Sequence, residues 1–217
     1  MSLSVVVLIS GSGSNLQALI DQSLEGKLDI TIKAVISNKA DAFGLERAKK
    51  ANIPAVFIDH KKFSTREEFD AALQYEIDQH KAELVVLAGF MRILTEGFTR
   101  HYDGKMLNIH PSLLPKFKGL NTHQRAIDAG DKEHGVSVHF VTAELDAGAV
   151  VLQAVTEIEP SDDAESLSKK VHNLEHKIYP LAIKWFSQKR LAYKSGKVML
   201  DSERLSDTGI RYQQDIH

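Results

Sequence analysis

Two side chains that can stabilise a developing negative charge stand at the end of an apolar stretch, where Asn108 and His110 follow Met106 and Leu107. In a strand, side chains two positions apart emerge on the same side, so both groups would face one spot. An amide N–H and a titratable imidazole can hold the oxygen that becomes negative during acyl transfer. The spacing indicates an acyl-transfer site, although a single histidine at a strand end is more often a packed side chain.

A glycine-containing turn, Ser10-Gly11-Ser12-Gly13-Ser14-Asn15, follows the first apolar run of the chain. Its glycines let the backbone approach a ligand, and the helix expected after it offers unpaired amides and the positive end of its dipole. Ser14 and Gln17 have the spacing of a capping box. A dinucleotide fingerprint would need glycine at Leu16 and an acidic residue near Asn38, so a single phosphate group is the expected ligand. A tight turn that binds nothing is the alternative.

Short β-branched runs alternate with amphipathic stretches in the first half, a pattern typical of βαβ units on a parallel sheet. Expected strands cover 5–10, 32–37, 55–58, 84–87 and 106–109, and expected helices cover 15–25, 43–51, 67–80 and 95–101. After Pro111 we expect a helix at 122–129, two neighbouring strands at 136–141 and 149–158, and a long helix from 161 to about 189, broken or bent at Pro180. The expected fold is α/β, with a Rossmann-like, mostly parallel twisted sheet, helices on both faces and antiparallel strands in the second half.

Composition narrows the classes of function. The sequence has 217 residues with 43% hydrophobic content, 27 Lys and Arg, 29 Asp and Glu, and no cysteine. A formal charge of -2 gives no basic field for nucleic acid, and without cysteine there are no disulfides, thiolate nucleophiles or cysteine-rich metal sites. No apolar run approaches the roughly 20 residues of a membrane-spanning helix. We therefore expect a soluble cytoplasmic protein that acts on small molecules, with no nucleic-acid or membrane partner.

Four segments carry a resemblance to a known family: Gly11-Ser12-Gly13-Ser14-Asn15-Leu16-Gln17, Ala88-Gly89-Phe90-Met91-Arg92-Ile93-Leu94, Asn108-Ile109-His110-Pro111-Ser112-Leu113-Leu114-Pro115-Lys116-Phe117-Lys118-Gly119 and Glu144-Leu145-Asp146. With them, the sequence resembles the folate-dependent formyltransferases over nearly its whole length. The glycine turn and the absence of an added domain favour the branch that acts on 5-phosphoribosylglycinamide. The resemblance implies that 10-formyltetrahydrofolate, as co-substrate and without a metal, gives its formyl group to the amine of 5-phosphoribosylglycinamide during purine synthesis.

The resemblance also implies the organisation of the chain. We expect one formyltransferase domain over 1–217, with a phosphate-binding βαβ half at about 1–105 and a catalytic and folate-binding half at about 106–190. C-terminal strands and a tail would follow at about 191–217. The protein would be a monomer or a homodimer.

The catalytic group implied by the resemblance is Asn108, His110 and Asp146, in which the carboxylate favours the charged imidazole and the other two side chains hold the formyl oxygen. The residues implied for the ribonucleotide are Gly13, Ser14, Asn15, Leu16, Gln17, His172 and Glu175. Those implied for the folate are Arg66, Met91, Arg92, Ile93, Leu94, Asn108, Thr142, Ala143, Glu144, Leu145 and Asp146. Taken alone, Arg66 fits a surface charge, and Met91 with Ile93 fits the core. Two positions depart from the family pattern, since many members have glutamine at His172 and glycine at Ala147.

Three alternatives stay open. A formyltetrahydrofolate hydrolase would keep the same catalytic group and admit water in place of the amine, although the intact glycine turn argues against it. A methionyl-tRNA formyltransferase shares the motif that begins at Asn108 but adds a basic RNA-contacting domain. The run His172-Asn173-Leu174-Glu175-His176 has the HxxEH pattern of a zinc hydrolase, with no third ligand evident.

Overall fold

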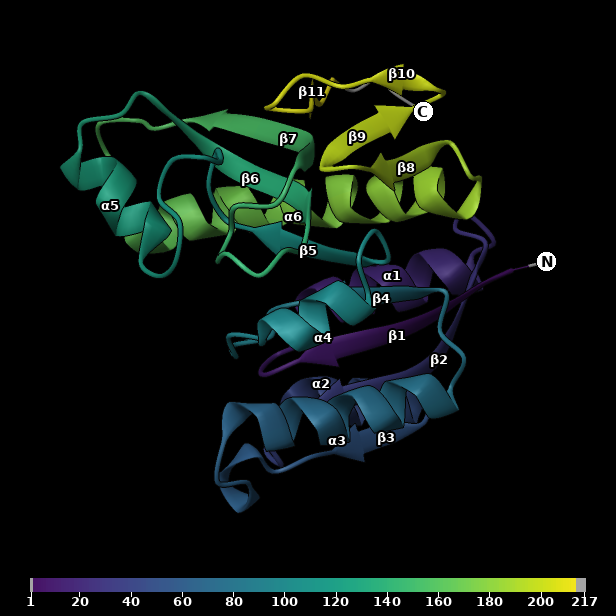
Figure 1. Ribbon diagram of the computed structural model, residues 1–217. Helices are drawn as coiled ribbons and strands as arrows, with labels where there is room; N and C mark the ends of the chain where they lie inside the picture. The colour runs from purple at the N-terminus through teal and green to yellow at the C-terminus, as the bar shows by residue number, and fades with distance from the viewer. Residues whose placement is uncertain (1, 214–217) are drawn as a thin grey trace. The chain divides into compact units, whose positions relative to one another are not determined.

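The computed structural model describes residues 2–213. The chain forms two compact units, 1–107 and 108–217, and each of them combines strands with helices (Figure 1). Within residues 2–213, no helix has the length and apolar character needed to cross a membrane.

The first unit contains a parallel sheet with the strand order β3-β2-β1-β4. Side chains 5–9 of the first strand are fully buried, as a parallel strand covered on both faces requires. Helix α1 packs against α2, and α3 packs against α4; Figure 1 shows the first pair behind the sheet and the second in front of it. The expected βαβ pattern with helices on both faces is confirmed. The elements are β1 (Leu3–Ile9), α1 (Ser14–Leu24), β2 (Ile30–Ser37), α2 (Phe43–Lys50), β3 (Ala55–Phe57), a 3₁₀ helix (His60–Lys62), α3 (Arg66–Gln79), β4 (Leu84–Leu87) and α4 (Glu96–His101).

Strand β5 (Met106–His110) crosses the boundary into the second unit. There β6 pairs with β7 in antiparallel fashion, as expected for the two neighbouring strands, and β11 pairs with β7 in parallel. Helix α6 packs against β6 and β7, while β8, β9 and β10 form a separate antiparallel sheet. The elements are α5 (Thr122–Asp128), β6 (Glu133–Phe140), β7 (Val150–Glu157), α6 (Ala164–Ser187), β8 (Leu191–Lys194), β9 (Lys197–Leu200), β10 (Glu203–Arg204) and β11 (Ile210–Arg211).

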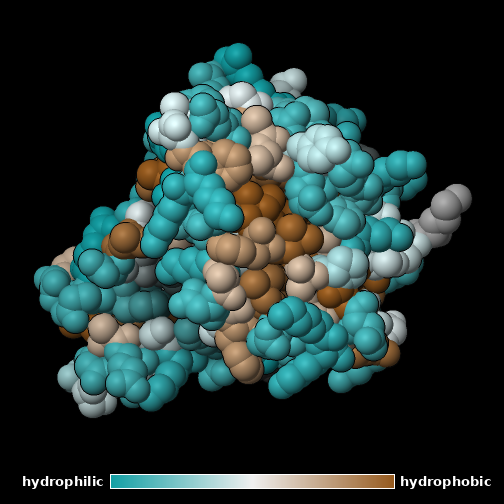
Figure 2. All heavy atoms as spheres, turned by 90° about the horizontal axis from the view of Figure 1, so that it is seen from below, coloured by the Kyte–Doolittle hydropathy of each residue, from teal (hydrophilic) through white to brown (hydrophobic). Residues whose placement is uncertain are grey.

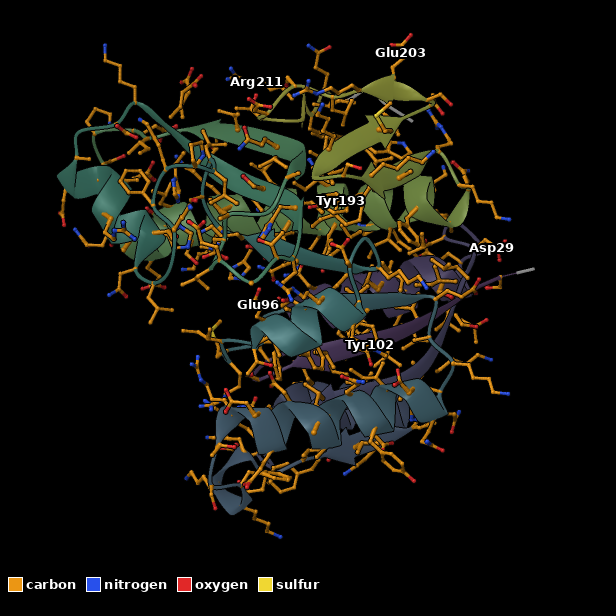
Figure 3. All side chains as sticks on the ribbon, viewed as in Figure 1. Asp29, Glu96, Tyr102, Tyr193, Glu203 and Arg211 are labelled. Atoms are coloured by element: carbon orange, nitrogen blue, oxygen red, sulfur yellow. The ribbon has the colours of Figure 1, made fainter. Side chains whose placement is uncertain are left out.

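The C-terminal strands are tied to β6 by two side chains labelled in Figure 3. The ring centroid of Tyr193 on β8 lies 4.9 Å from that of Phe140, the last residue of β6. Arg211 on β11 places Nη2 2.7 Å from Oε1 of Glu133 at the start of the same strand. Both ends of β6 are therefore anchored from the C-terminal segment.

The surface seen from below is mostly hydrophilic, with one apolar patch near its middle (Figure 2). In the first unit, the large apolar side chains that are exposed are Leu24, Phe43, Phe57, Tyr75, Met91 and Ile93.

One local prediction is wrong, and another is wrong in part. Gly13, with φ 70°, is the N-cap of α1 and no side chain caps this end, so the capping box predicted for Ser14 and Gln17 does not form. Of the break or bend predicted at Pro180, the break does not occur, because α6 continues through the proline as one helix. A proline inside a helix removes one hydrogen bond, and here the neighbouring Tyr179 and Ala182 are fully buried and hold the helix in place.

Candidate active site

His110 and Asp146 form a buried pair in the second unit. Nδ1 of His110 lies 3.4 Å from Oδ2 of Asp146, and the two residues are only 5% and 9% exposed. His110 ends β5, whereas Asp146 belongs to the loop between β6 and β7. Asn108 lies two positions earlier on β5 and contacts His139, whose Nε2 lies 3.8 Å from Oδ1 of Asp146. The structure thus brings together the three residues predicted as the catalytic group.

Both ring nitrogens of His110 face hydrogen-bond acceptors. Nδ1 faces the Asp146 carboxylate, and Nε2 lies 2.9 Å from the backbone carbonyl oxygen of Phe117. Because a carboxylate and a carbonyl oxygen can only accept, both contacts are satisfied when both nitrogens carry a proton. With both nitrogens protonated, His110 presents two donors, and the Nε2–H can donate to an oxyanion that takes the place of the Phe117 carbonyl.

His139 lies between Asn108 and Asp146 and accepts a hydrogen bond from Asn108. Its Nδ1 donates to the carbonyl oxygen of Phe140 at 2.9 Å, which leaves Nε2 to accept from Nδ2 of Asn108 at 3.1 Å. Nε2 also lies 3.8 Å from Oδ1 of Asp146. Burial holds the pKa of His139 well below its usual range, so the ring is neutral. A neutral His139 fixes the amide of Asn108 and leaves its second N–H for another acceptor.

Two buried histidines of the second unit make stability depend on pH. Burial lowers the pKa of His134 to about 4, and that of His139 moves in the same direction, while both rings titrate near ~6.5 in an unfolded chain. Below that pH the unfolded chain binds more protons than the folded chain does. The stability that the two neutral rings contribute is therefore present above about pH 6.5 and is lost as the pH falls toward 4. We expect a loss of up to about 2 kcal/mol per histidine between pH 7 and pH 5, measured by urea unfolding.

The variant His134→Gln isolates this effect, because glutamine keeps a side-chain N–H and does not titrate. Its free energy of unfolding should fall less than that of the wild type between the two pH values. An unchanged pH dependence would show that His134 is not the group that titrates.

The loop that carries Asp146 presents one buried carboxylate and otherwise exposed side chains. Asp146 has a left-handed backbone with φ 49°, and its Oδ2 also accepts a hydrogen bond from the amide of Gly119 at 2.9 Å. Gly148 packs so closely on the carbonyl of Phe140 that any Cβ would overlap it, which brings the two ends of the loop together. Residues 142–145, predicted to bind folate, are half-buried or exposed. The loop thus directs its carboxylate at the histidine and leaves the preceding residues open to solvent.

The glycine turn of the first unit begins α1. Gly13 accepts a hydrogen bond from the amide of Gln17 at 2.9 Å, and the left-handed backbone of Gly13 suits a residue without a side chain. Ser14 and Gln17 are half-buried, and Asn15 and Leu16 are buried. The open end of α1 keeps the positive end of the helix dipole for an external acceptor, so the backbone amides that precede Gln17 can hold an anion.

Gly13→Ala is expected to destabilise the protein by more than the strain of its backbone alone. A Cβ at Gly13 would lie 2.7 Å from Cα of Gly44, and φ of 70° is itself unfavourable for alanine. Gly26→Ala is the matched control, since Gly26 has φ 68° and no atom within 4 Å of the added Cβ. The control should lose about 1 kcal/mol and Gly13→Ala should lose more. Thermal unfolding compares them, and equal losses would contradict the packing argument.

The segment predicted to bind folate in the first unit follows β4. Met91 and Ile93 are 63% and 52% exposed, so the interpretation of this pair as core is wrong, whereas Leu94 is buried. The amide of Met91 donates to Oγ of Ser10 at 2.8 Å, which ties the segment to the first residue of the glycine turn. Of the other residues predicted for folate in this unit, Arg66 is exposed and Arg92 is half-buried.

His172 and Glu175 lie one turn apart on α6, with Nε2 of His172 3.8 Å from Oε2 of Glu175. The Glu175 side chain is 6% exposed and that of His172 is 52% exposed. The last residue of the HxxEH pattern, His176, has its pKa lowered by burial. Across the part of the chain that the structure describes, no group of three or more His, Asp or Glu side chains could hold a metal ion. The geometry gives the zinc-hydrolase alternative no support.

The sequence patterns missed two parts of this site. His139 lies in β6, where the alternation of apolar and polar residues predicts a half-buried strand with His139 on its polar side. The structure buries His139 to 2% exposure, and a buried imidazole requires hydrogen-bond partners. Phe117 and Gly119 take part through a backbone carbonyl and a backbone amide. Side-chain patterns do not specify such groups.

Comparison with known proteins gives consistent matches. Residues 3–183 match the formyl transferase family. The phosphoribosylglycinamide formyltransferase of Escherichia coli (strain K12) is 51% identical over 207 residues, which cover 95% of this chain and 98% of that protein. The trifunctional purine biosynthetic protein adenosine-3 of Bos taurus is 50% identical over 179 residues, covering 82% of this chain and 18% of that protein. Among solved structures, the phosphoribosylglycinamide formyltransferase from Coxiella burnetii has a TM-score of 0.95 and 52% identity, covering 98% of this chain and 100% of that one.

Proposed function

The chain belongs to the formyl transferase family, and on this basis we propose that it transfers the formyl group of 10-formyltetrahydrofolate to the amine of 5-phosphoribosylglycinamide. The products are formylglycinamide ribonucleotide and tetrahydrofolate, in purine biosynthesis. The observation that carries the proposal is the buried pair of His110 and Asp146, with Asn108 beside it at the carboxyl end of β5. This is the arrangement that a formyl oxygen requires when it becomes negative.

The reaction begins when the amine nitrogen attacks the formyl carbon, so that a C–N bond forms and the carbonyl oxygen becomes negative. The free N–H of Asn108 and the imidazolium of His110 stabilise this oxygen, which replaces the Phe117 carbonyl as acceptor of the Nε2 proton. Collapse of the intermediate breaks the bond from the formyl carbon to N10 of the folate. The amine loses one proton and N10 gains one, through His110 or a water molecule, so no covalent enzyme intermediate is needed.

The remaining predicted residues each take one part of a substrate. Gly13 to Gln17 bind the phosphate at the positive end of α1, through the backbone amides that precede Gln17, whose own amide donates to Gly13. The buried carboxylate of Glu175 accepts hydrogen bonds from the ribose hydroxyls, with His172 beside it. The folate is bound by Arg66, Met91 to Leu94, Asn108 and Thr142 to Asp146.

We propose that both partners are small molecules and that the enzyme works in the cytoplasm as a monomer or homodimer. No metal is required, because the charge on the formyl oxygen is stabilised by Asn108 and His110. A net charge of -2 fits the absence of a nucleic-acid partner. We also propose one formyltransferase domain over 1–217, and the family match at 3–183, which includes residues of both units, supports this.

The test is release of tetrahydrofolate from 10-formyltetrahydrofolate, measured with and without 5-phosphoribosylglycinamide. Turnover is expected only when both substrates are present. Equal turnover without the ribonucleotide would support the hydrolase, and formylation of methionyl-tRNA in its place would support the tRNA-directed enzyme. Either result would refute the proposed function.

A further inference from the structure

We infer that Arg47, on α2, is a positioning residue for the glycine turn. It holds the carbonyl oxygen of Ser12 and the side-chain oxygen of Gln17 away from the ligand, so that the backbone amides of the turn face the phosphate. The inference rests on the proposed function, because it takes Gly13 to Gln17 as the phosphate-binding residues.

The guanidinium of Arg47 contacts the turn at two acceptors. Nε donates to the carbonyl oxygen of Ser12 at 2.8 Å, and Nη1 donates to Oε1 of Gln17 at 3.0 Å. The guanidinium carbon lies 4.8 Å from the ring centroid of Phe43, a cation–π contact that fixes the position of the charged group. Arg47 therefore spans the turn and the first turn of α1 with a forked pair of donors, a geometry that lysine does not offer.

The contact with Ser12 sets the direction of a backbone amide. In a planar trans peptide the C=O and the N–H point in opposite directions. Since the carbonyl of Ser12 is directed at Arg47, the amide of Gly13 points away from α2. The amide of Gly44 likewise donates to the carbonyl of Gly11 at 3.1 Å. Donors on α2 thus bind the carbonyl oxygens of two consecutive residues, Gly11 and Ser12. The amides of Ser12 and Gly13 face the other side, where an anion can accept hydrogen bonds from them.

The contact with Gln17 removes a second acceptor from the turn. The side-chain oxygen of Gln17 would repel a phosphate, and Arg47 holds it, while Nε2 of Gln17 donates to Oδ1 of Asp21 at 2.8 Å. The close packing of Gly13 on Gly44 leaves no room for a substitute side chain between the turn and α2. Loss of Arg47 therefore frees two acceptors to turn toward the ligand.

The test compares 5-phosphoribosylglycinamide with the same substrate lacking its phosphate. Arg47→Met should lower kcat/KM about tenfold for the phosphorylated substrate, the effect of losing one charge-assisted hydrogen bond. For the dephosphorylated substrate, and in the KM for 10-formyltetrahydrofolate, the change should stay below about twofold. Lys50→Met is the matched control, since Lys50 carries the same charge on α2 and lies 5.9 Å from the same Phe43 ring; it should lose less than about twofold with either substrate.

Equal losses with both substrates would mean that Arg47 only supports the fold, and a matching loss in Lys50→Met would mean a general charge effect. Each of these results overturns the inference.

If Arg47→Met does not fold, as judged by circular dichroism, Arg47→Lys replaces it. One ammonium group can satisfy only one of the two acceptors, so a loss of about threefold confined to the phosphorylated substrate is expected, and no loss overturns the inference. A wild-type protein without formyl transfer would refute the proposed function instead. In that case the affinity of the wild type and of the Arg47 variant for inorganic phosphate, measured by calorimetric titration, tests the inference. Equal affinities overturn it.

Discussion

Replacing His110 with alanine is expected to lower kcat at least about a hundredfold while leaving the fold intact. The imidazolium is one of two donors to the formyl oxygen, and the loss of a single oxyanion donor costs about 3 kcal/mol in other acyl-transfer enzymes. The KM values for both substrates should change much less, because the interaction with the oxygen strengthens only as its charge develops. Steady-state kinetics with each substrate varied in turn measures the effect.

The chain offers a matched control for this change. His101 also pairs with an aspartate, with Nε2 3.2 Å from Oδ2 of Asp78, but the two side chains are 43% and 45% exposed. His101→Ala removes a histidine–carboxylate pair at the surface of the first unit and should leave kcat within about twofold of the wild type. Near-normal turnover by His110→Ala would mean that the histidine is a packed side chain without a role in transfer.

Asp146→Asn is expected to lower kcat about a hundredfold through the loss of charge alone. Asparagine has nearly the same shape, and its side-chain oxygen can still accept from His110 and from the amide of Gly119. What it lacks is the negative charge 3.4 Å from the imidazole, which attracts the positively charged form of the ring. The variant should therefore fold normally and bind both substrates, but its His110 should carry the neutral imidazole in place of the imidazolium.

Asp78→Asn is the control for this second change, since it removes the carboxylate of the exposed pair with His101. Its kcat should match that of the wild type. If Asp146→Asn also retained full kcat, the carboxylate would serve only to hold Gly119 and the loop. The charge assigned to His110 would then have another origin.

The strand and the turn that carry the chemistry follow from local sequence. The apolar run before Asn108 and His110 predicts β5, and its two-residue period places both side chains on one side. The glycine turn is predicted because Gly11 and Gly13 directly follow the run that forms β1. The partner of His110 is different, because no local pattern connects it with Asp146, and only the family resemblance pointed to that residue.

Contacts between distant segments explain what the sequence could not predict. The spacing of Ser14 and Gln17 predicts a capping box, but Arg47 binds the side chain of Gln17 from another helix, and Gly13 begins α1 in a left-handed conformation. The alternation around His139 predicts a polar position on a half-buried strand, whereas the ring is buried and both of its nitrogens are engaged in the site. Local spacing predicts which residues can cap a helix or pack in the core. It does not predict which long side chain from a distant segment contacts them.

The central claim is that His110 and Asp146 act as one unit in formyl transfer, and a double-mutant cycle on kcat tests it most directly. Four proteins are compared: wild type, His110→Ala, Asp146→Asn and the double variant. If the carboxylate works only through the imidazole, the double variant should be no slower than His110→Ala alone. Losses that multiply, so that the double variant is slower by the product of the two single effects, would contradict the account.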